Sequence, residues 1–346
     1  MITEFVKITD TTAPEAISAI EKAADIIKNG GLVVMPTETV YGLGGNGLDA
    51  SAAKKIYAAK GRPADNPLII HIACPDDAKK YCHVSPLYRD LARAFMPGPL
   101  TVIMPKKDII PLSVTAGLET VAVRCPDHPV ANALIRAAGV PIAAPSANLS
   151  GKPSPTTAEY VMEDMKGKVD MVIDGGESEI GLESTIVMIK NDTVTLLRPG
   201  AVTYDALCMV SEKVEIDHSV LEMLKENEKP LSPGMKYKHY APCTPLVLLD
   251  GKEENVLEFL RGEIKNKKCA ILCYDEESDL SQGACLLPIG KREDLRAHAH
   301  TLFTSLRDAD KLGCDIIYAH LPPKTGLGLA LYNRMIRAAS HTIKKV

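Results

Sequence analysis

Short apolar strands alternate with amphipathic helices along most of this chain, and that alternation limits the fold more than any other feature of the sequence. The first helix is predicted from Pro14 onward, because apolar residues recur every three or four positions until Asn29-Gly30-Gly31 ends the pattern. The same order recurs downstream, which predicts an α/β fold built on a mixed sheet. Helices are also expected at 51–60 and 86–95, and strands at 32–35, 67–72, 100–105, 120–124, 140–144, 169–173, 184–189 and 194–197.

The length of 346 residues exceeds what one hydrophobic core usually organises, so two domains of unequal size are expected. The first domain is predicted to span residues 1–202. Residues 203–244 lose the alternation and include a turn-rich stretch, which is typical of a linker. Residues 245–346 resume the alternation, which predicts a smaller, doubly wound domain.

Composition narrows the classes of function. The formal net charge is −4, and this chain therefore lacks the basic excess of a protein built to bind nucleic acid strongly. RNA could be contacted only through a local basic patch. The sequence begins without a targeting segment and has no apolar run of membrane-spanning length, so a cytoplasmic protein is expected. Nine cysteines without a CxxC pair predict reduced thiols rather than a zinc site.

A glycine-rich segment follows the strand predicted at 32–35. Residues 36–45 read Pro-Thr-Glu-Thr-Val-Tyr-Gly-Leu-Gly-Gly and place hydroxyls, a carboxylate and glycines in one predicted turn. Glycines let backbone N–H groups approach a ligand closely, although an ordinary strand-to-helix turn has the same composition. The segment matches neither common nucleotide-binding glycine motif, so it does not identify a nucleotide site by itself.

A cationic segment follows the helix predicted at 51–60. It reads Lys-Gly-Arg-Pro-Ala-Asp-Asn-Pro over residues 60–67 and leads into a strand that ends near His71. The ammonium of Lys60 and the forked guanidinium of Arg62 suit a polyphosphate. Cations that complement a helix dipole are the alternative, and the same position favours them.

Polar groups also follow two predicted strands. Ser146 and Asn148 come after the strand at 140–144, where a hydroxyl and an amide can bind phosphate oxygens or form a local turn. Arg124 ends a strand apolar enough to be buried, so its guanidinium needs a carboxylate partner, either internal or from a ligand. His71 similarly ends an apolar strand, where a satisfied core histidine is the commoner case.

Taken in order, these segments resemble the threonylcarbamoyl-AMP synthase family, whose core is a YrdC-like domain. The motifs that carry the resemblance are P-T-E-T-V-Y-G-L-G, K-G-R-P-x-D-N-P-L-I-I-H, P-G-P-L-T, V-A-V-R-C-P, A-P-S-A-N-x-S-G, G-x-E-S-T-I and R-P-G. The later S-P-G-M-K-Y-K-H-Y-A-P and the second α/β segment resemble the two-domain form. The resemblance implies a YrdC-like twisted mixed sheet flanked by helices, a linker and a Rossmann-like C-terminal domain.

The resemblance also implies an enzyme, an L-threonylcarbamoyladenylate synthase. In this reaction L-threonine and bicarbonate or CO2 form a carbamate, which attacks the α-phosphate of ATP and expels pyrophosphate. Mg2+ is expected to come with ATP rather than to occupy a protein-only site. A separate transferase would then modify tRNA. By similarity, the catalytic residues are Lys60, Arg62, Ser146 and Asn148; ATP would also contact Asn66, Thr120, Ser154, Arg198 and Tyr237; and L-threonine would contact Thr39, His71, Arg124, Ala144 and Ser184.

In the two-domain form the linker is expected to fold over the active site. Tyr237 or Tyr240 would then reach the nucleotide, while Lys236 and Lys238 add positive charge. The alternative function is an RNA-binding module of translation or ribosome maturation, since a basic cleft in such a domain could contact tRNA weakly. A carbamoyl-transfer enzyme of hydrogenase maturation contains a similar domain, but the missing CxxC pairs and the chain length argue against it.

Overall fold

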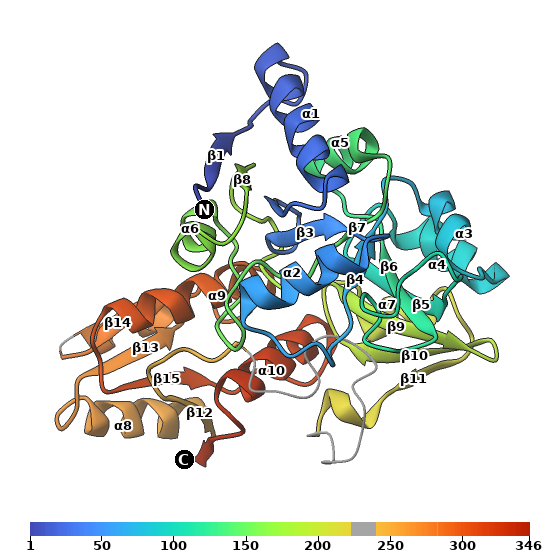
Figure 1. Cartoon of the computed structure of the whole chain (residues 1–346). Helices are drawn as coiled ribbons and strands as arrows, with labels where there is room; N and C mark the ends of the chain where they lie inside the picture. Colours follow the sequence, from blue (N-terminus) through green and yellow to red (C-terminus); the bar gives the residue numbers. More distant parts are fainter. Residues whose placement is uncertain (223–239, 282) are drawn as a thin grey trace. The chain divides into compact units, whose positions relative to one another are not determined.

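The computed structural model describes residues 1–222, 240–281 and 283–346, which divide into two compact units (Figure 1). The first unit holds Met1–Ser150, Pro155–Glu179 and the described residues from 183 to 222. The second unit holds the described residues from 240 onward and two short segments, Gly151–Ser154 and Ile180–Leu182. The domain limits predicted at 202 and 244 stay a prediction.

Eleven strands within the described residues form one mixed sheet in the first unit, as the alternation predicts. Their order is β1-β8-β2-β3-β7-β4-β6-β5-β9-β10-β11. Parallel pairs such as β4 with β6 lie beside antiparallel pairs such as β6 with β5. The strands are β1 Glu4–Lys7, β2 Val33–Met35, β3 Gly42–Asn46, β4 Ile69–His71, β5 Leu100–Pro105, β6 Thr120–Arg124, β7 Ile142–Ala143, β8 Met171–Asp174, β9 Thr185–Lys190, β10 Thr193–Arg198 and β11 Val214–Ile216.

Three helices of the first unit, α1, α2 and α4, agree with the helices predicted from Pro14 and at 51–60 and 86–95. Pro14 opens α1, and the side chain of Asp49 caps α2 by accepting a hydrogen bond from the N–H of Ser51. Gly61 ends α2 in the left-handed conformation with φ 60°, which glycine adopts without steric cost. The helices are α1 Pro14–Lys28, α2 Ala50–Lys60, α3 Ala78–Tyr81, α4 Pro86–Phe95, α5 Pro129–Ala138, α6 Ala158–Met165 and α7 Tyr204–Cys208, with 3-10 turns η1 Pro75–Asp77 and η2 His218–Val220.

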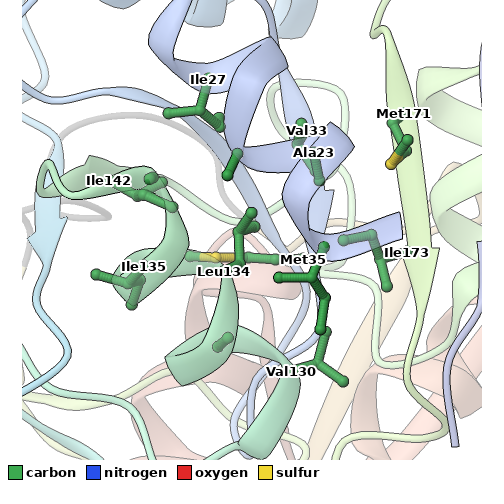
Figure 2. Close-up of a cluster of buried hydrophobic side chains, with 14 of the residues drawn as sticks. Ala23, Ile27, Val33, Met35, Val130, Leu134, Ile135, Ile142, Met171 and Ile173 are labelled. Carbon is green, nitrogen blue, oxygen red and sulfur yellow. The ribbon is translucent and has the colours of Figure 1, made fainter. Parts of the chain in front are cut away.

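One core cluster of the first unit lies between two helices and the sheet (Figure 2). Ala23 and Ile27 from α1 point toward Leu134 and Ile135 from α5, over Met35 of β2. Each fully buried aliphatic side chain of this kind stabilises the fold by about 1.5–3 kcal/mol. The helices thereby fix one face of the strands that lead into the polar segments.

The turn predicted for residues 36–45 is wrong in its second half, because Gly42–Asn46 forms β3 inside the sheet. Close packing explains why this strand is rich in glycine. A Cβ added at Gly44 would lie 2.8 Å from Cγ2 of Ile142 and 3.0 Å from the carbonyl oxygen of Val33. The glycines therefore serve the approach of neighbouring backbones as much as any ligand.

The second unit contains a wholly parallel five-stranded sheet among its described residues, in the order β14-β13-β15-β12-β16. Its doubly wound arrangement agrees with the predicted Rossmann-like domain. In the described residues no helix is both long and apolar enough to cross a bilayer. The elements are β12 Leu246–Asp250, α8 Glu253–Glu263, β13 Cys269–Cys273, η3 Asp275–Ser281, β14 Cys285–Pro288, α9 Leu295–Lys311, β15 Ile316–His320, α10 Gly326–Ala338 and β16 Ile343–Lys345.

Candidate active site

Lys60 stands at the end of α2 and is buried, with its ammonium aimed at the segment after β7. Its Nζ donates hydrogen bonds to the carbonyl oxygens of Ser146 and Asn148, the second at 2.6 Å. The Oγ of Ser146 donates to Oδ1 of Asn148 over 2.5 Å, and the same Oδ1 lies 3.3 Å from Nζ. Three of the four predicted catalytic residues therefore share one hydrogen-bonded cluster.

The loop between α2 and β4 holds the next two predicted residues. The guanidinium of Arg62 approaches the carbonyl oxygens of Asn66 and Pro67 at 3.4 and 3.5 Å. Tyr57 donates to the same Asn66 carbonyl over 2.9 Å, which ties the loop to α2. The side-chain amide of Asn66 is buried and makes no hydrogen bond within the described residues. A buried amide in this condition is a candidate ligand contact, because leaving it unbonded is costly.

Two polar loops run side by side next to this cluster. The N–H of Leu43 donates to the carbonyl of Pro145, and the N–H of Ala147 donates to the carbonyl of Tyr41, each over 2.8 Å. The loop before β3 is thus fixed against the loop after β7. This pairing connects the Lys60 cluster to the residues predicted to bind threonine.

Arg124 has an internal carboxylate partner, which was one of the two possibilities that the sequence left open. Its Nη2 lies 2.7 Å from Oε1 of Glu38, and both side chains are buried. The pair is close in distance but not aligned as a hydrogen bond among the described residues. Glu38 is a residue that the sequence reasoning did not assign, although it lies within the P-T-E-T motif.

His71 lies beside Arg124 in the sheet, since the two residues are in register between β4 and β6. Its Nδ1 is 3.3 Å from the carbonyl oxygen of Ile142. Burial, and secondarily the positive charge of Arg124, lower the pKa of His71 to about 3. The imidazole is therefore neutral at physiological pH, and can supply one donor and one acceptor.

Ser184 and Arg198 extend this row of polar groups across the sheet. The Oγ of Ser184 lies 2.8 Å from Oγ1 of Thr101, which is in register with Arg124 on the next strand. Arg198 donates from Nε to the carbonyl of Ser184 and from Nη2 to its Oγ, at 3.0 and 3.1 Å. Thr101 was not predicted as a site residue, although the P-G-P-L-T motif contains it.

Thr39 and Ala144 lie in the two paired loops. The Oγ1 of Thr39 is 2.9 Å from Oγ1 of Thr37, which itself donates to the carbonyl of Val40 over 2.6 Å. Ala144 donates its N–H to the carbonyl of Ile69 over 2.9 Å, at the edge of β4. Both side chains are buried.

The remaining predicted residues are Thr120, Ser154 and Tyr237, with Tyr240 as the alternative to Tyr237. Thr120 opens β6 and Arg124 ends it, so they are separated along the strand by about 13 Å at roughly 3.3 Å per residue. Ser154 is buried and belongs to the second unit. Tyr240 also belongs to that unit, where its ring stacks on Phe303 with centroids 5.2 Å apart. Tyr237, Lys236 and Lys238 lie outside the residues that the structure describes.

Positive charge dominates the predicted site residues of the first unit. Lys60, Arg62, Arg124 and Arg198 are all buried. The buried carboxylates in the same motifs are those of Glu38 and Glu183. Buried Lys and Arg side chains of this kind suit an anionic ligand, because they form charge-assisted hydrogen bonds to phosphate and carboxylate oxygens.

Comparison with known proteins identifies the family. The Sua5, YciO and YrdC family model, described as telomere recombination, matches residues 25–200, and a model described as the C-terminal domain of threonylcarbamoyl-AMP synthase matches residues 202–340. The threonylcarbamoyl-AMP synthase of Bacillus subtilis is 43% identical over 97% of this chain and 96% of the relative. This chain belongs to the threonylcarbamoyl-AMP synthase family. The resemblance inferred from the motifs, including its two-domain form, is confirmed.

Other relatives of the threonylcarbamoyl-AMP synthase family agree with this assignment. The Pyrococcus abyssi threonylcarbamoyl-AMP synthase is 43% identical over 94% of this chain and 96% of its own length. The crystal structure of P. abyssi Sua5 complexed with L-threonine covers 100% of both chains at 40% identity, with a TM-score of 0.88. The chain is therefore an enzyme of this family, and the interpretation as an RNA-binding module is not favoured.

Proposed function

We propose that this enzyme makes L-threonylcarbamoyladenylate from L-threonine, bicarbonate or CO2, and ATP, and releases pyrophosphate. The observation that carries the proposal is the joining of two clusters by the paired loops. Lys60, Ser146 and Asn148 form one cluster, and Arg124 and Ser184 belong to the other. One suits a polyphosphate and the other an amino acid, which are the two substrates that an adenylate synthase must hold together.

The phosphates of ATP would bind where Lys60 and Arg62 supply positive charge. Lys60 already donates to the two carbonyls that shape the loop after β7, so it would both hold that loop and neutralise phosphate. Asn66 and Arg198 would contact the rest of the nucleotide, together with Thr120, Ser154 and Tyr237. Attack on the α-phosphate needs positioning and charge neutralisation rather than a protein nucleophile, and these residue types provide that.

L-Threonine would bind along the polar row of the sheet. Its carboxylate would face the guanidinium of Arg124, and the amino group would face Glu38, so that the buried ion pair meets both charges of the zwitterion. The amino acid of the P. abyssi complex supports this choice of ligand. Thr39, His71, Ala144 and Ser184 would shape the pocket around the side chain. Contacts to one methyl group limit discrimination against serine to about 1–3 kcal/mol.

Mg2+ would enter with ATP. No group of three or more His, Cys, Asp or Glu side chains in the described residues could hold a metal ion. The hydroxyl of Ser146 and the amide oxygen of Asn148 are hard donors that fit the water shell or the open position of a phosphate-bound Mg2+. We assign the metal to the nucleotide, with these two side chains as its protein contacts.

The product would serve tRNA modification through a separate threonylcarbamoyl transferase. The test of the function is pyrophosphate release from MgATP by the full-length enzyme, with L-threonine and bicarbonate omitted in turn. Release is expected to require both. Equal release without threonine, or tight RNA binding in a gel shift at physiological salt without any release, would contradict the proposal.

A further inference from the structure

The second unit contains a cavity that the proposed function does not use. Its volume is about 230 Å3, and its polar lining consists of Tyr274, Arg292, His298 and His320. Apolar side chains such as those of Ile289 and Met335 form the rest of the wall. All of these residues belong to one compact unit.

The cavity lies at the carboxyl ends of two adjacent parallel strands. Tyr274 directly follows β13, and His320 is the last residue of β15, which pairs with β13. From β13 the chain continues to β14 at one edge of the sheet, whereas from β15 it continues through α10 to β16 at the other edge. Neighbouring strands whose connections run in opposite directions form a topological switch point, where doubly wound sheets bind their ligands.

The polar wall of the cavity is built from flat groups. The ring of Tyr274 stacks on the imidazoles of His298 and His320, with centroids 5.1 and 4.6 Å apart. The guanidinium carbon of Arg292 lies 4.6 Å from the same ring centroid. Burial raises the pKa of Tyr274 to about 12, so its phenol stays neutral. Flat faces beside apolar walls favour a planar ligand.

The charge of Arg292 is already matched by carboxylates. Its Nη2 lies 2.6 Å from Oε1 of Glu253 and 3.1 Å from Oε1 of Glu277, and this Glu277 oxygen is also 2.8 Å from Nε2 of His320. Burial opposes ionisation of Glu277, but His320 and Arg292 outweigh it and hold its pKa below the usual range. An anion entering the cavity would compete with these two carboxylates, and a cation would meet the guanidinium. An uncharged ligand avoids both costs.

His298 offers a defined hydrogen-bonding group in this wall. Burial lowers its pKa, so the imidazole is neutral. Its Nε2 is 2.8 Å from the carbonyl oxygen of Lys291, and because a carbonyl only accepts, Nε2 carries the proton. Nδ1 is then an acceptor, which complements the ring N–H or amino group of a nitrogen heterocycle.

We propose that this cavity is a binding site for an uncharged, planar nitrogen heterocycle of nucleobase size. The volume of 230 Å3 sets the size, since it is smaller than the roughly 300 Å3 at which pockets for drug-sized ligands begin. The site is distinct from the proposed synthase site, because none of the residues assigned to ATP or L-threonine lines this cavity.

The test uses the full-length protein with isotopically labelled methionine methyl groups. The methyl resonance of Met335, assigned from a Met335→Leu variant, reports occupancy of the cavity. Adenine is the neutral probe, and benzoate and benzylamine are the anionic and cationic rings. Adenine is expected to shift the resonance in a saturable way, with both charged rings at least about ten-fold weaker, which corresponds to 1.4 kcal/mol. An unmoved resonance, or tighter binding of either charged ring, would overturn the site.

Matched variants separate this cavity from the proposed nucleotide site. Ile289→Phe fills the cavity, and Tyr274→Leu removes the ring against which the two imidazoles and the guanidinium of the wall are packed, so each is expected to weaken adenine binding by about ten-fold or more. Ile289→Val keeps the space and should keep the shift. Adenine bound only at the nucleotide site would leave Met335 unmoved, which contradicts the proposal. If the unmodified enzyme released no pyrophosphate from MgATP in the presence of L-threonine and bicarbonate, but adenine still shifted the Met335 resonance, the synthase function would be refuted and the cavity site would be supported.

Discussion

Arg124 and Glu38 form a buried ion pair in which Nη2 and Oε1 are 2.7 Å apart. Arg124 ends β6, whereas Glu38 precedes β3, so the folded sheet brings together groups that lie 86 positions apart in the chain, as 124 minus 38 gives. Neither atom is aligned as a hydrogen bond within the described residues. An opposite pair with spare hydrogen-bonding capacity is suited to a ligand that carries both charges.

Glu38→Gln is expected to raise KM for L-threonine by about 10–100-fold, because a charged hydrogen bond to the amino group is worth roughly 1.5–3 kcal/mol. KM for ATP should change little. Initial rates of pyrophosphate release at varied threonine measure the effect. Glu119→Gln, at an exposed position just before β6, is the matched control. A correctly folded Glu38→Gln enzyme with an unchanged KM for threonine would disprove the assignment.

Lys60→Ala is expected to lower kcat/KM for ATP by about 100-fold or more, since one phosphate cation and the anchor of the loop after β7 are lost together. Lys54→Ala removes an exposed lysine from the same helix and should leave the rate within about two-fold. Steady-state kinetics on both variants provide the comparison. Equal rates for the two variants would rule out a phosphate role for Lys60.

Because of His71, the free energy of unfolding is expected to decrease as the pH is lowered. Its pKa is about 3 in the folded chain and 6.5 as the ordinary value, so between these values the unfolded chain binds more protons. Stability is therefore full above about pH 6.5 and falls as the pH decreases. When the pH is lowered from 7.5 to 5.5, protonation of this residue in the unfolded chain should reduce the free energy of unfolding by about 1.4 kcal/mol.

Urea unfolding of the protein and of His71→Gln at the two pH values isolates that contribution. The variant should lose about 1.4 kcal/mol less on acidification. His83→Gln, at an exposed position, is expected to behave like the unmodified protein. The same acid sensitivity in His71→Gln would show that other groups cause it.

Gly44→Ala is expected to destabilise the first unit by about 1–3 kcal/mol, because the new Cβ would press on Ile142 and on the backbone of Val33. Gly262→Ala is the opposite control. Apart from the adjacent residues and the nearby backbone of α8, no described atom lies within 4 Å of a Cβ at Gly262, so alanine there should stabilise by about 0.4–1 kcal/mol. Thermal unfolding of both variants tests whether packing is the reason for glycine in β3.

Several elements could be predicted from local sequence alone. The helix predicted from Pro14 and the strand predicted at 120–124 agree with α1 and β6. Their patterns are local, since burial of one helical face or of a whole strand repeats at a fixed period. Strand β3 was missed because its glycines resemble a turn, and only the neighbouring backbones of β2 and β7 explain them.

The candidate site likewise has residues that the motifs indicate and contacts that only the folded structure shows. The motifs alone indicated Lys60, Ser146 and Arg124, because cations and hydroxyls at the ends of buried elements are unusual unless they have partners. They did not indicate that Glu38 is the partner of Arg124 or that Thr101 contacts Ser184.

The sequence by itself therefore determined the class of fold and the family, since both are encoded in local patterns and ordered motifs, and it predicts the segments expected to carry the chemistry. Only the tertiary structure decided which buried charges meet. It also decided that the carboxyl ends of β13 and β15 enclose a cavity in the second unit. The physical reason is that strand order and register join residues distant in the chain, and no local pattern encodes that pairing.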